Sequence, residues 1–220
     1  MRILIAVPTY ENIYPDTFKS IYDLDQTYDK NKIVPTTLEY VPNEHIFEFI
    51  RGYDVATARN NIVNKAKELE VDYILMVDND TVLPKDSLTN LLEWDEDVVL
   101  GFYAHRDKTI GFDGKTNCCK LGEFNYTWQY TVEEVTGLRM QGNHLVQIHG
   151  GGMGCALIKT SVFDRIKYPW YDWVNYDDDA RGLLSEDLYF CEQCKWQNIP
   201  IYMDTRVGCG HIFRTIQEVM

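Results

Sequence analysis

Short runs suited to strands alternate with segments of helical spacing, and this alternation constrains the fold of the chain more than any other feature. The strand-like runs, most of them strongly apolar, lie at residues 2–7, 37–41, 71–77, 98–103, 155–158 and 199–203. Apolar side chains recur at helical spacing at residues 16–24, 55–69, 84–92 and 188–197. Because strands joined by helices wind with right-handed crossovers, we expect an α/β fold with a mainly parallel sheet flanked by helices.

Local signals set the expected limits of some of these elements. Pro8 is expected to end the first strand. Phe18, Ile21 and Tyr22 are expected to share one side of the first helix. Residues 104–149 show no clear period, which predicts short strands and loops and a candidate flap over a binding site.

The composition excludes several classes of function. The 220 residues suffice for one domain with its own core, so we expect a single domain over residues 1–220. The net charge of −13 would be repelled by nucleic-acid phosphates. The N-terminus shows no signal-peptide pattern, and no segment reaches the roughly 18 apolar residues of a membrane span. We therefore expect a cytoplasmic protein with reduced cysteines that binds no nucleic acid.

Two carboxylates follow the apolar run at residues 71–77, in the sequence Asp78-Asn79-Asp80. Asp and Asn also form ordinary turns, so the spacing alone has little specificity. In open α/β sheets, however, ligands bind at the carboxyl ends of strands. A strand that ends in two carboxylates can hold a hard divalent cation there, with phosphate oxygens completing its coordination.

Five segments in order resemble the motifs of glycosyltransferases with the GT-A fold, especially the large family-2-like group. The segments are IAVPTY at 5–10, ARN at 58–60, VDNDTVLP at 77–84, SED at 185–187 and GCGH at 208–211. They cover nearly the whole chain. The resemblance implies a single GT-A-like, Rossmann-like domain.

The resemblance also implies a reaction and assigns the binding of the two substrates to different halves of the chain. The expected reaction moves a sugar from a nucleoside-diphosphate sugar, for which we expect a UDP-sugar, to a hydroxyl acceptor with inversion. Residues 1–103 would form the half that binds the nucleotide sugar. Residues 104–220 would form the half that binds the acceptor.

The metal ion implied by the resemblance is Mn²⁺ or Mg²⁺, both of which suit carboxylate and phosphate ligands. Asp80 is expected to coordinate it directly. Asp78 would reach it through water or contact the ribose. His211, in the GCGH segment at 208–211, would also bind the metal ion, and its imidazole would favour Mn²⁺.

The acidic pair after Ser185, a suitable N-cap, is the expected catalytic centre. An inverting enzyme needs a carboxylate that takes the proton from the acceptor hydroxyl. By resemblance this role falls to Asp187, with Glu186 binding or orienting the acceptor. The same acids could simply complement a helix dipole, and a retaining reaction would not use Asp187 as base.

Contacts to the donor are expected from the loop after Val7, the ARN helix start, the D-x-D segment and the glycine cluster at residues 150–154. The expected residues are Pro8, Thr9, Tyr10, Glu11, Arg59, Asp78, Asn79, Gly151 and Gly152. The aromatic stretch at residues 168–179 is expected to be a loop. Its residues Trp170, Tyr171 and Trp173 could stack on sugar rings or could fill the core.

Three other classes of protein stay open from the sequence alone. Cys191, Cys194, Cys209 and His211 have the ligand types of a structural zinc site, although thiols three residues apart on an apolar helix also pack in cores. A metal-dependent nucleotidyltransferase also pairs carboxylates with a metal. It would normally carry a glycine-rich phosphate loop, whereas the loop after Val7 is not glycine-rich. A non-catalytic protein that binds a nucleotide sugar or a metal would keep the pocket without turnover.

Overall fold

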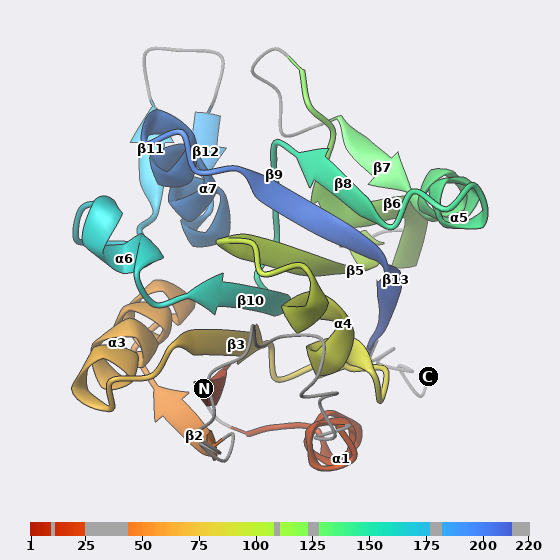
Figure 1. Ribbon diagram of the computed structural model, residues 1–220. Helices are drawn as coiled ribbons and strands as arrows, with labels where there is room; N and C mark the ends of the chain where they lie inside the picture. The colour runs from red at the N-terminus through yellow and green to blue at the C-terminus, as the bar shows by residue number, and fades with distance from the viewer. Residues whose placement is uncertain (10–11, 25–43, 108–110, 123–127, 177–181, 213–220) are drawn as a thin grey trace, which may run out of the picture.

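The computed structural model describes residues 1–9, 12–24, 44–107, 111–122, 128–176 and 182–212 (Figure 1). The helices are α1 (Pro15–Tyr22), α3 (Val55–Glu68), α4 (Ser87–Glu93), α5 (Val132–Met140), α6 (Val162–Arg165) and α7 (Glu186–Trp196). The strands are β1 (Arg2–Thr9), β2 (Glu44–Arg51), β3 (Tyr73–Val77), β4 (Thr81–Val82), β5 (Val98–Asp107), β6 (Gly111–Cys119), β7 (Gln129–Thr131), β8 (Leu145–Ile148), β9 (Gly150–Gly151), β10 (Cys155–Lys159), β11 (Val174–Tyr176), β12 (Gly182–Leu184) and β13 (Ile201–His211). The strand expected at residues 37–41 lies outside the described residues.

An 11-stranded sheet forms the centre of the molecule, with its main path in the order β2-β1-β3-β10-β5-β13-β4. The α/β class with flanking helices is confirmed. The sheet is mixed, however, where the sequence predicted mainly parallel pairing. β1 pairs in parallel with β2 and β3, and β13 pairs in parallel with β5. β10 runs antiparallel between β3 and β5, because the chain enters it from β9 without a crossover helix.

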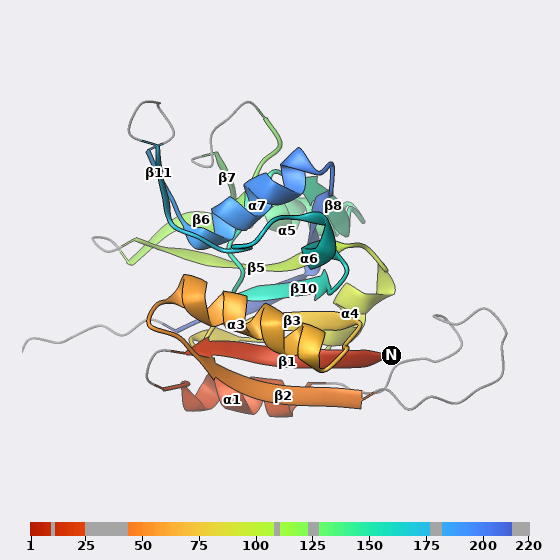
Figure 2. The ribbon, with the colours of Figure 1, turned by 90° about the vertical axis from the view of Figure 1, so that its left-hand side faces the viewer.

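Both faces of the central sheet are buried, which explains why its strands are apolar along their whole length. One set of alternate residues, such as Leu4 and Ile74, packs against α3, α6 and α7. The other set, such as Ile5 and Leu75, packs against α1 and α4. Figure 2 views the face covered by α3, α6 and α7. The two hydrophobic layers fix the sheet between the helices and hold the strand ends in place.

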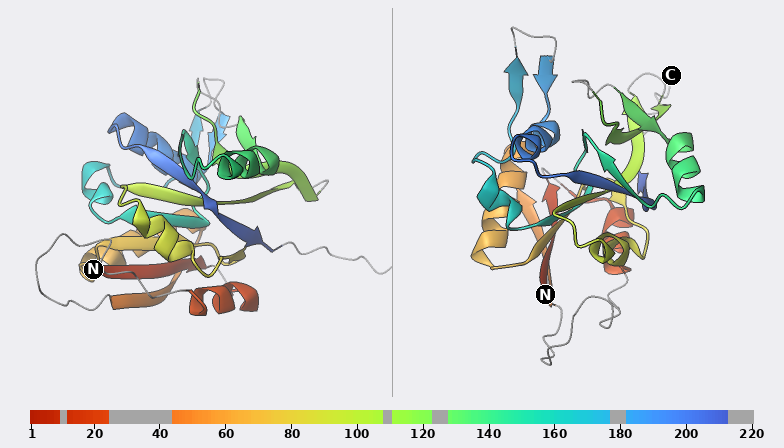
Figure 3. Two further views of the ribbon diagram at one scale, coloured as in Figure 1. Left: turned by 45° about the vertical axis from the view of Figure 1, so that its right-hand side comes forward. Right: turned by 45° about the horizontal axis from the view of Figure 1, so that its top comes forward.

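The second half of the chain adds an antiparallel extension to the sheet, seen from two directions in Figure 3. β6 pairs with β5, β7 and β9, and β8 pairs with β13. Residues 104–149 therefore contain strands as expected. They also contain α5, which the sequence analysis missed. A capping box between Thr131 and Glu134 begins this helix.

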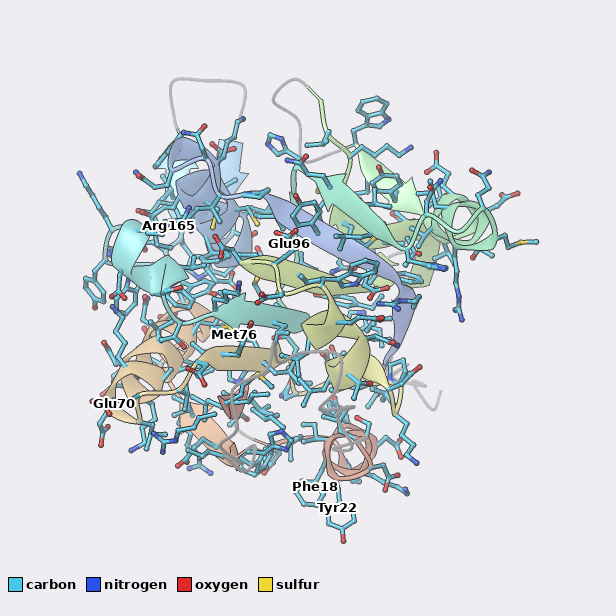
Figure 4. The ribbon with its side chains drawn as sticks, viewed as in Figure 1. Phe18, Tyr22, Glu70, Met76, Glu96 and Arg165 are labelled. Carbon is cyan, nitrogen blue, oxygen red and sulfur yellow. The ribbon has the colours of Figure 1, made fainter. Side chains whose placement is uncertain are left out.

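Several local expectations were wrong. Pro8 lies inside β1, opposite Ile50 and beyond the residues that pair with β3, so its missing N–H removes no bond to β3. On α1, Phe18 and Tyr22 are exposed, at 46 % and 78 %, and Tyr22 points away from the body of the molecule in Figure 4. The buried side of α1 consists of Thr17, Ser20 and Ile21.

Two further observations complete the fold. The aromatic stretch was expected to be a loop, but it contains β11, which pairs with β12 in a separate two-stranded sheet. Among the helices in the described part of the chain, none is long and apolar enough to cross a membrane.

Candidate active site

The carboxyl ends of β1 and β3 and the amino ends of α3 and α7 meet around one pocket of about 440 Å³. These four ends lie on the same side of the molecule, on the left in Figure 2. The pocket is lined by Pro8, Thr9, Asp54, Val55, Ala58, Arg59, Asp78, Asn79, Asp80, Trp173, Ser185, Glu186 and Asp187. Most of the site residues expected from the sequence are therefore brought together. Tyr10 and Glu11 lie outside the described residues.

Arg59 occupies the centre of this pocket and is almost completely buried, with 2 % of its surface exposed. Its Nη2 donates a hydrogen bond of 2.9 Å to Asp78, and its Nε lies 3.3 Å from Glu186. Burial lowers the pKa of a guanidinium, but the carboxylates of Asp78, Glu186 and Asp187 outweigh it and raise the pKa of Arg59 above its usual value. Arg59 therefore joins the D-x-D segment to the acidic pair of α7.

Two polar groups of residues that line the pocket are buried without a hydrogen-bond partner in the described structure. They are Nη1 of Arg59 and the hydroxyl of Thr9. Buried polar groups are usually satisfied, and an exception in a pocket indicates the place of a ligand. Asn79 is used differently: its side chain donates to the carbonyl of Asn12 and its carbonyl accepts from the N–H of Tyr14. Asn79 thus holds the loop that follows β1.

Asp80 and His211 face each other because β4 pairs with the end of β13, with His211 opposite Thr81. Nδ1 of His211 lies 2.8 Å from the carbonyl oxygen of Ala104, so Nδ1 carries a hydrogen. Nε2 lies 3.6 Å from Asp80 Oδ1. A histidine fixed through Nδ1 to a carbonyl, with Nε2 turned toward a carboxylate, is the usual arrangement of a metal-binding imidazole.

The donor set at this place fits a divalent cation, although it is incomplete by itself. Within the residues the structure describes, no group of three His, Cys, Asp or Glu side chains is arranged to hold a metal ion. Asp78 was expected to reach the metal through water or to contact the ribose, and this stays a prediction; Oδ1 of Asp78 is bound to Arg59. Burial, followed by the proximity of Asp80 and Asp187, raises the pKa of Asp78 in spite of Arg59. Asp80 and His211 lie close to each other as expected, and their role as metal ligands stays a prediction.

Glu186 and Asp187 begin α7, and their surroundings differ. Burial raises the pKa of Glu186 to about 7, against the opposing effect of Arg59 and with the help of Asp187. Oδ1 of Asp187 accepts hydrogen bonds from the hydroxyl of Ser185 and, at 2.8 Å, from the N–H of Leu188. Ser185 is the N-cap residue as expected, but its hydroxyl binds Asp187 and makes no capping bond.

The two glycines expected at the site differ in position. A Cβ on Gly152 would lie 2.4 Å from Tyr103 Oη and 3.4 Å from Asp187 Oδ2, so Gly152 packs beside Asp187. A Cβ on Gly151 would instead meet Asn117 and Leu100 in the interior. Neither glycine is among the residues that line the described pocket.

Sequence reasoning missed one residue of the pocket and left two alternatives open for the aromatic stretch. Asp54 lines it and caps α3 by accepting from the N–H of Thr57, a signal present in the spacing D-x-x-T. Of the aromatic stretch, Trp170 and Tyr171 are buried in the core and only Trp173 reaches the pocket. Asn60, next to Arg59, is used to hold the backbone of the two buried aromatic residues.

The alternative of a zinc site finds no support in the described structure. Cys191 and Cys194 are buried among the apolar residues beneath α7. Cys209 packs against the hydrophobic layer on the other face of the sheet. These thiols therefore do not converge with His211.

Comparison with known proteins gives a fold and no closer relationship. No protein-family model matches the chain, and no curated protein matches it. The solved structure of A197 from STIV is similar over 97 % of this chain and 87 % of its own, with a TM-score of 0.58 and 18 % identity. The structure of GalNAc-T7 with UDP, GalNAc and Mn²⁺ is similar over 97 % of this chain but only 43 % of its own, with a TM-score of 0.60 and 10 % identity. The likeness shows a GT-A-like α/β fold.

Proposed function

We propose that the protein is a metal-dependent glycosyltransferase that moves a sugar from a nucleoside-diphosphate sugar, a UDP-sugar, to a hydroxyl acceptor with inversion. The observation that carries the proposal is the convergence of Arg59, Asp80, Glu186 and Asp187 on one pocket at the carboxyl ends of the strands. Such a pocket on a GT-A-like fold combines a cation site with a candidate base. A structural neighbour that was solved with UDP, GalNAc and Mn²⁺ supports this choice of donor and metal.

The donor would lie between the loop after β1 and the D-x-D segment. Asp80 and His211 would hold the metal ion, which when bound supplies Lewis-acid stabilisation of the leaving diphosphate. The hydroxyl of Thr9 and Nη1 of Arg59 would donate hydrogen bonds to the nucleotide, because both are buried and lack a partner within the described residues.

The acceptor would lie on the side of α7. Oδ1 of Asp187 accepts two hydrogen bonds, which fix the carboxylate and leave Oδ2, beside Gly152, as the oxygen that takes the proton. In the reaction the acceptor oxygen forms a bond to the anomeric carbon and loses its proton to Asp187. The bond from that carbon to the diphosphate breaks, and its electron pair leaves with the nucleotide.

A nucleotide-release assay tests this proposal. A panel of UDP- and GDP-sugars is incubated with Mn²⁺, Mg²⁺ or EDTA, using wild type, Asp80→Ala and the control Asp86→Ala, whose carboxylate is exposed and lies outside the pocket. We expect metal-dependent release of one nucleotide. We also expect a loss of about 100-fold in Asp80→Ala, since metal stabilisation is worth several kcal/mol.

The other outcomes of this assay separate the alternatives. Binding of a nucleotide without release from any sugar would favour a non-catalytic binding protein. Neither binding nor release with either metal would refute the proposal. An equal loss in Asp86→Ala would show that the effect of Asp80→Ala is not specific to the pocket.

A further inference from the structure

The charge of the pocket restricts the acceptor that it can accommodate. Five carboxylates line it: Asp54, Asp78, Asp80, Glu186 and Asp187. Among the described lining residues Arg59 is the one cation, and its guanidinium already binds two of these acids. The negative charge of the donor diphosphate would by itself require a bound divalent ion in this acidic pocket. An acceptor with its own negative charge would therefore be repelled.

One aromatic ring lies beside the candidate base. The strands β11 and β12 pair with Val174 opposite Leu184, so Trp173 and Ser185 each adjoin the last paired residues, close to the start of α7. Figure 2 shows these strands next to the beginning of α7. Trp173 and Ser185 line the same pocket as Asp187, and on this ground we assign Trp173 to the side of the pocket formed by α7.

Trp173 is also more exposed than the two nearest aromatic residues before it. Its surface is 47 % exposed, whereas Trp170 and Tyr171 are 7 % and 1 % exposed. The N–H of Trp173 donates to Asp172, which fixes the backbone at the pocket rim. A large apolar face held at the mouth of a polar pocket is suited to a ligand with one apolar face and several hydroxyl groups.

We propose that the acceptor is an uncharged sugar ring that stacks on Trp173 and presents a hydroxyl group to Asp187. The axial C–H groups of a pyranose give it an apolar face for the indole. Its remaining hydroxyls donate hydrogen bonds to the carboxylates that would repel an acidic acceptor. This inference rests on the proposed glycosyl transfer and extends it to the class of the second substrate.

Saturation-transfer NMR tests the proposal without turnover. The probes are the methyl glycosides of glucose, galactose, mannose and N-acetylglucosamine, with the first three each paired with the corresponding uronate, which differs only in carrying a carboxylate. We expect at least one neutral glycoside to bind, and its uronate to bind about tenfold more weakly. Trp173→Ala should lose the signal and Trp173→Phe should keep it. Trp196→Ala removes an equally exposed indole at the far end of α7 and should match wild type.

Two results would overturn the proposal: a uronate that binds as well as its neutral partner, or binding in Trp173→Ala equal to that of wild type. The absence of binding by every neutral glycoside would also overturn it. Where the protein releases nucleotide, Trp173→Ala should raise the KM of the acceptor about tenfold.

The proposal can fail independently of the proposed function. Sugar binding that depends on Trp173, without nucleotide release, refutes the transferase and keeps the sugar site. Nucleotide release without sugar binding refutes this acceptor class alone.

Discussion

Replacing Arg59 with methionine tests the ion pairs at the centre of the pocket. Methionine has a similar length but no charge, so Asp78 and Glu186 would lose their cation. The side chain of Glu186 is only 6 % exposed and that of Asp78 is 27 % exposed. Removing one partner of a buried ion pair costs about 3–5 kcal/mol, and the partial exposure of Asp78 favours the lower value of about 3 kcal/mol.

The loss should be visible in unfolding experiments followed by circular dichroism. For a domain of this size, about 3 kcal/mol lowers the melting temperature by about 6–12 °C. In the Arg59→Met protein, Glu186→Gln should recover part of the loss when unfolding is measured well above pH 7, because it removes the buried charge that Arg59→Met leaves unpaired. Arg59→Lys, which keeps the charge, should lose less than Arg59→Met.

A matched control is available at the surface. Arg165 pairs with Asp97, is 44 % exposed and lies at the outside of the molecule in Figure 4. Arg165→Met should cost less than about 1 kcal/mol, as exposed pairs usually do. A similar cost for Arg59→Met, or no recovery by Glu186→Gln, would refute the view that Arg59 holds the two acidic motifs together.

Two further outcomes follow from the site. The pKa of Glu186 is about 7 in the folded protein, above the ordinary 4.5, so the stability that this group contributes is complete below pH 4.5 and is lost as the pH rises through 7. Urea denaturation should show a loss of about 3 kcal/mol over this range in wild type and none in Glu186→Gln. The same dependence of stability on pH in both proteins would contradict the raised pKa. Gly152→Ala would place a Cβ 2.4 Å from Tyr103 Oη, so nucleotide release should fall at least about tenfold and recover when Tyr103→Phe removes that oxygen. The control Gly137→Ala, whose Cβ would meet nothing within 4 Å, should match wild type. No effect of Gly152→Ala would contradict the close packing of Gly152 against Tyr103.

The parts of the fold that were predicted correctly depend on local pattern. The apolar run before Asp78 and the helical spacing of α3 each identify an element without reference to the rest of the chain. The direction of β10 has no such signal, because a strand buried on both faces reads the same in either orientation. The exposed side of α1 was mispredicted because Phe18 packs edge-to-face on Phe47 and stacks on Phe49 near the rim, outside the core.

The site was predicted where motifs carry it and missed where it depends on tertiary contacts. Asp80, Glu186 and Asp187 were found from short segments and lie in one pocket, but their roles remain predictions. The use of Arg59 as a bridge could not be read from the sequence, since its partners are 19 and 127 positions away. The orientation of His211 depends on the backbone carbonyl of Ala104, and because every residue has such a carbonyl, this contact cannot be predicted from the sequence.

The position of β10 has a consequence for how the protein forms during synthesis. β10 separates β3 from β5, so the strands made first cannot complete the sheet until residue 159 has emerged. Until then the inner edges of β3 and β5 lack their hydrogen-bonding neighbour, and such edges are prone to pair with other chains. A fragment that ends at residue 103 should therefore aggregate, and adding the missing strand as part of the second half should rescue it.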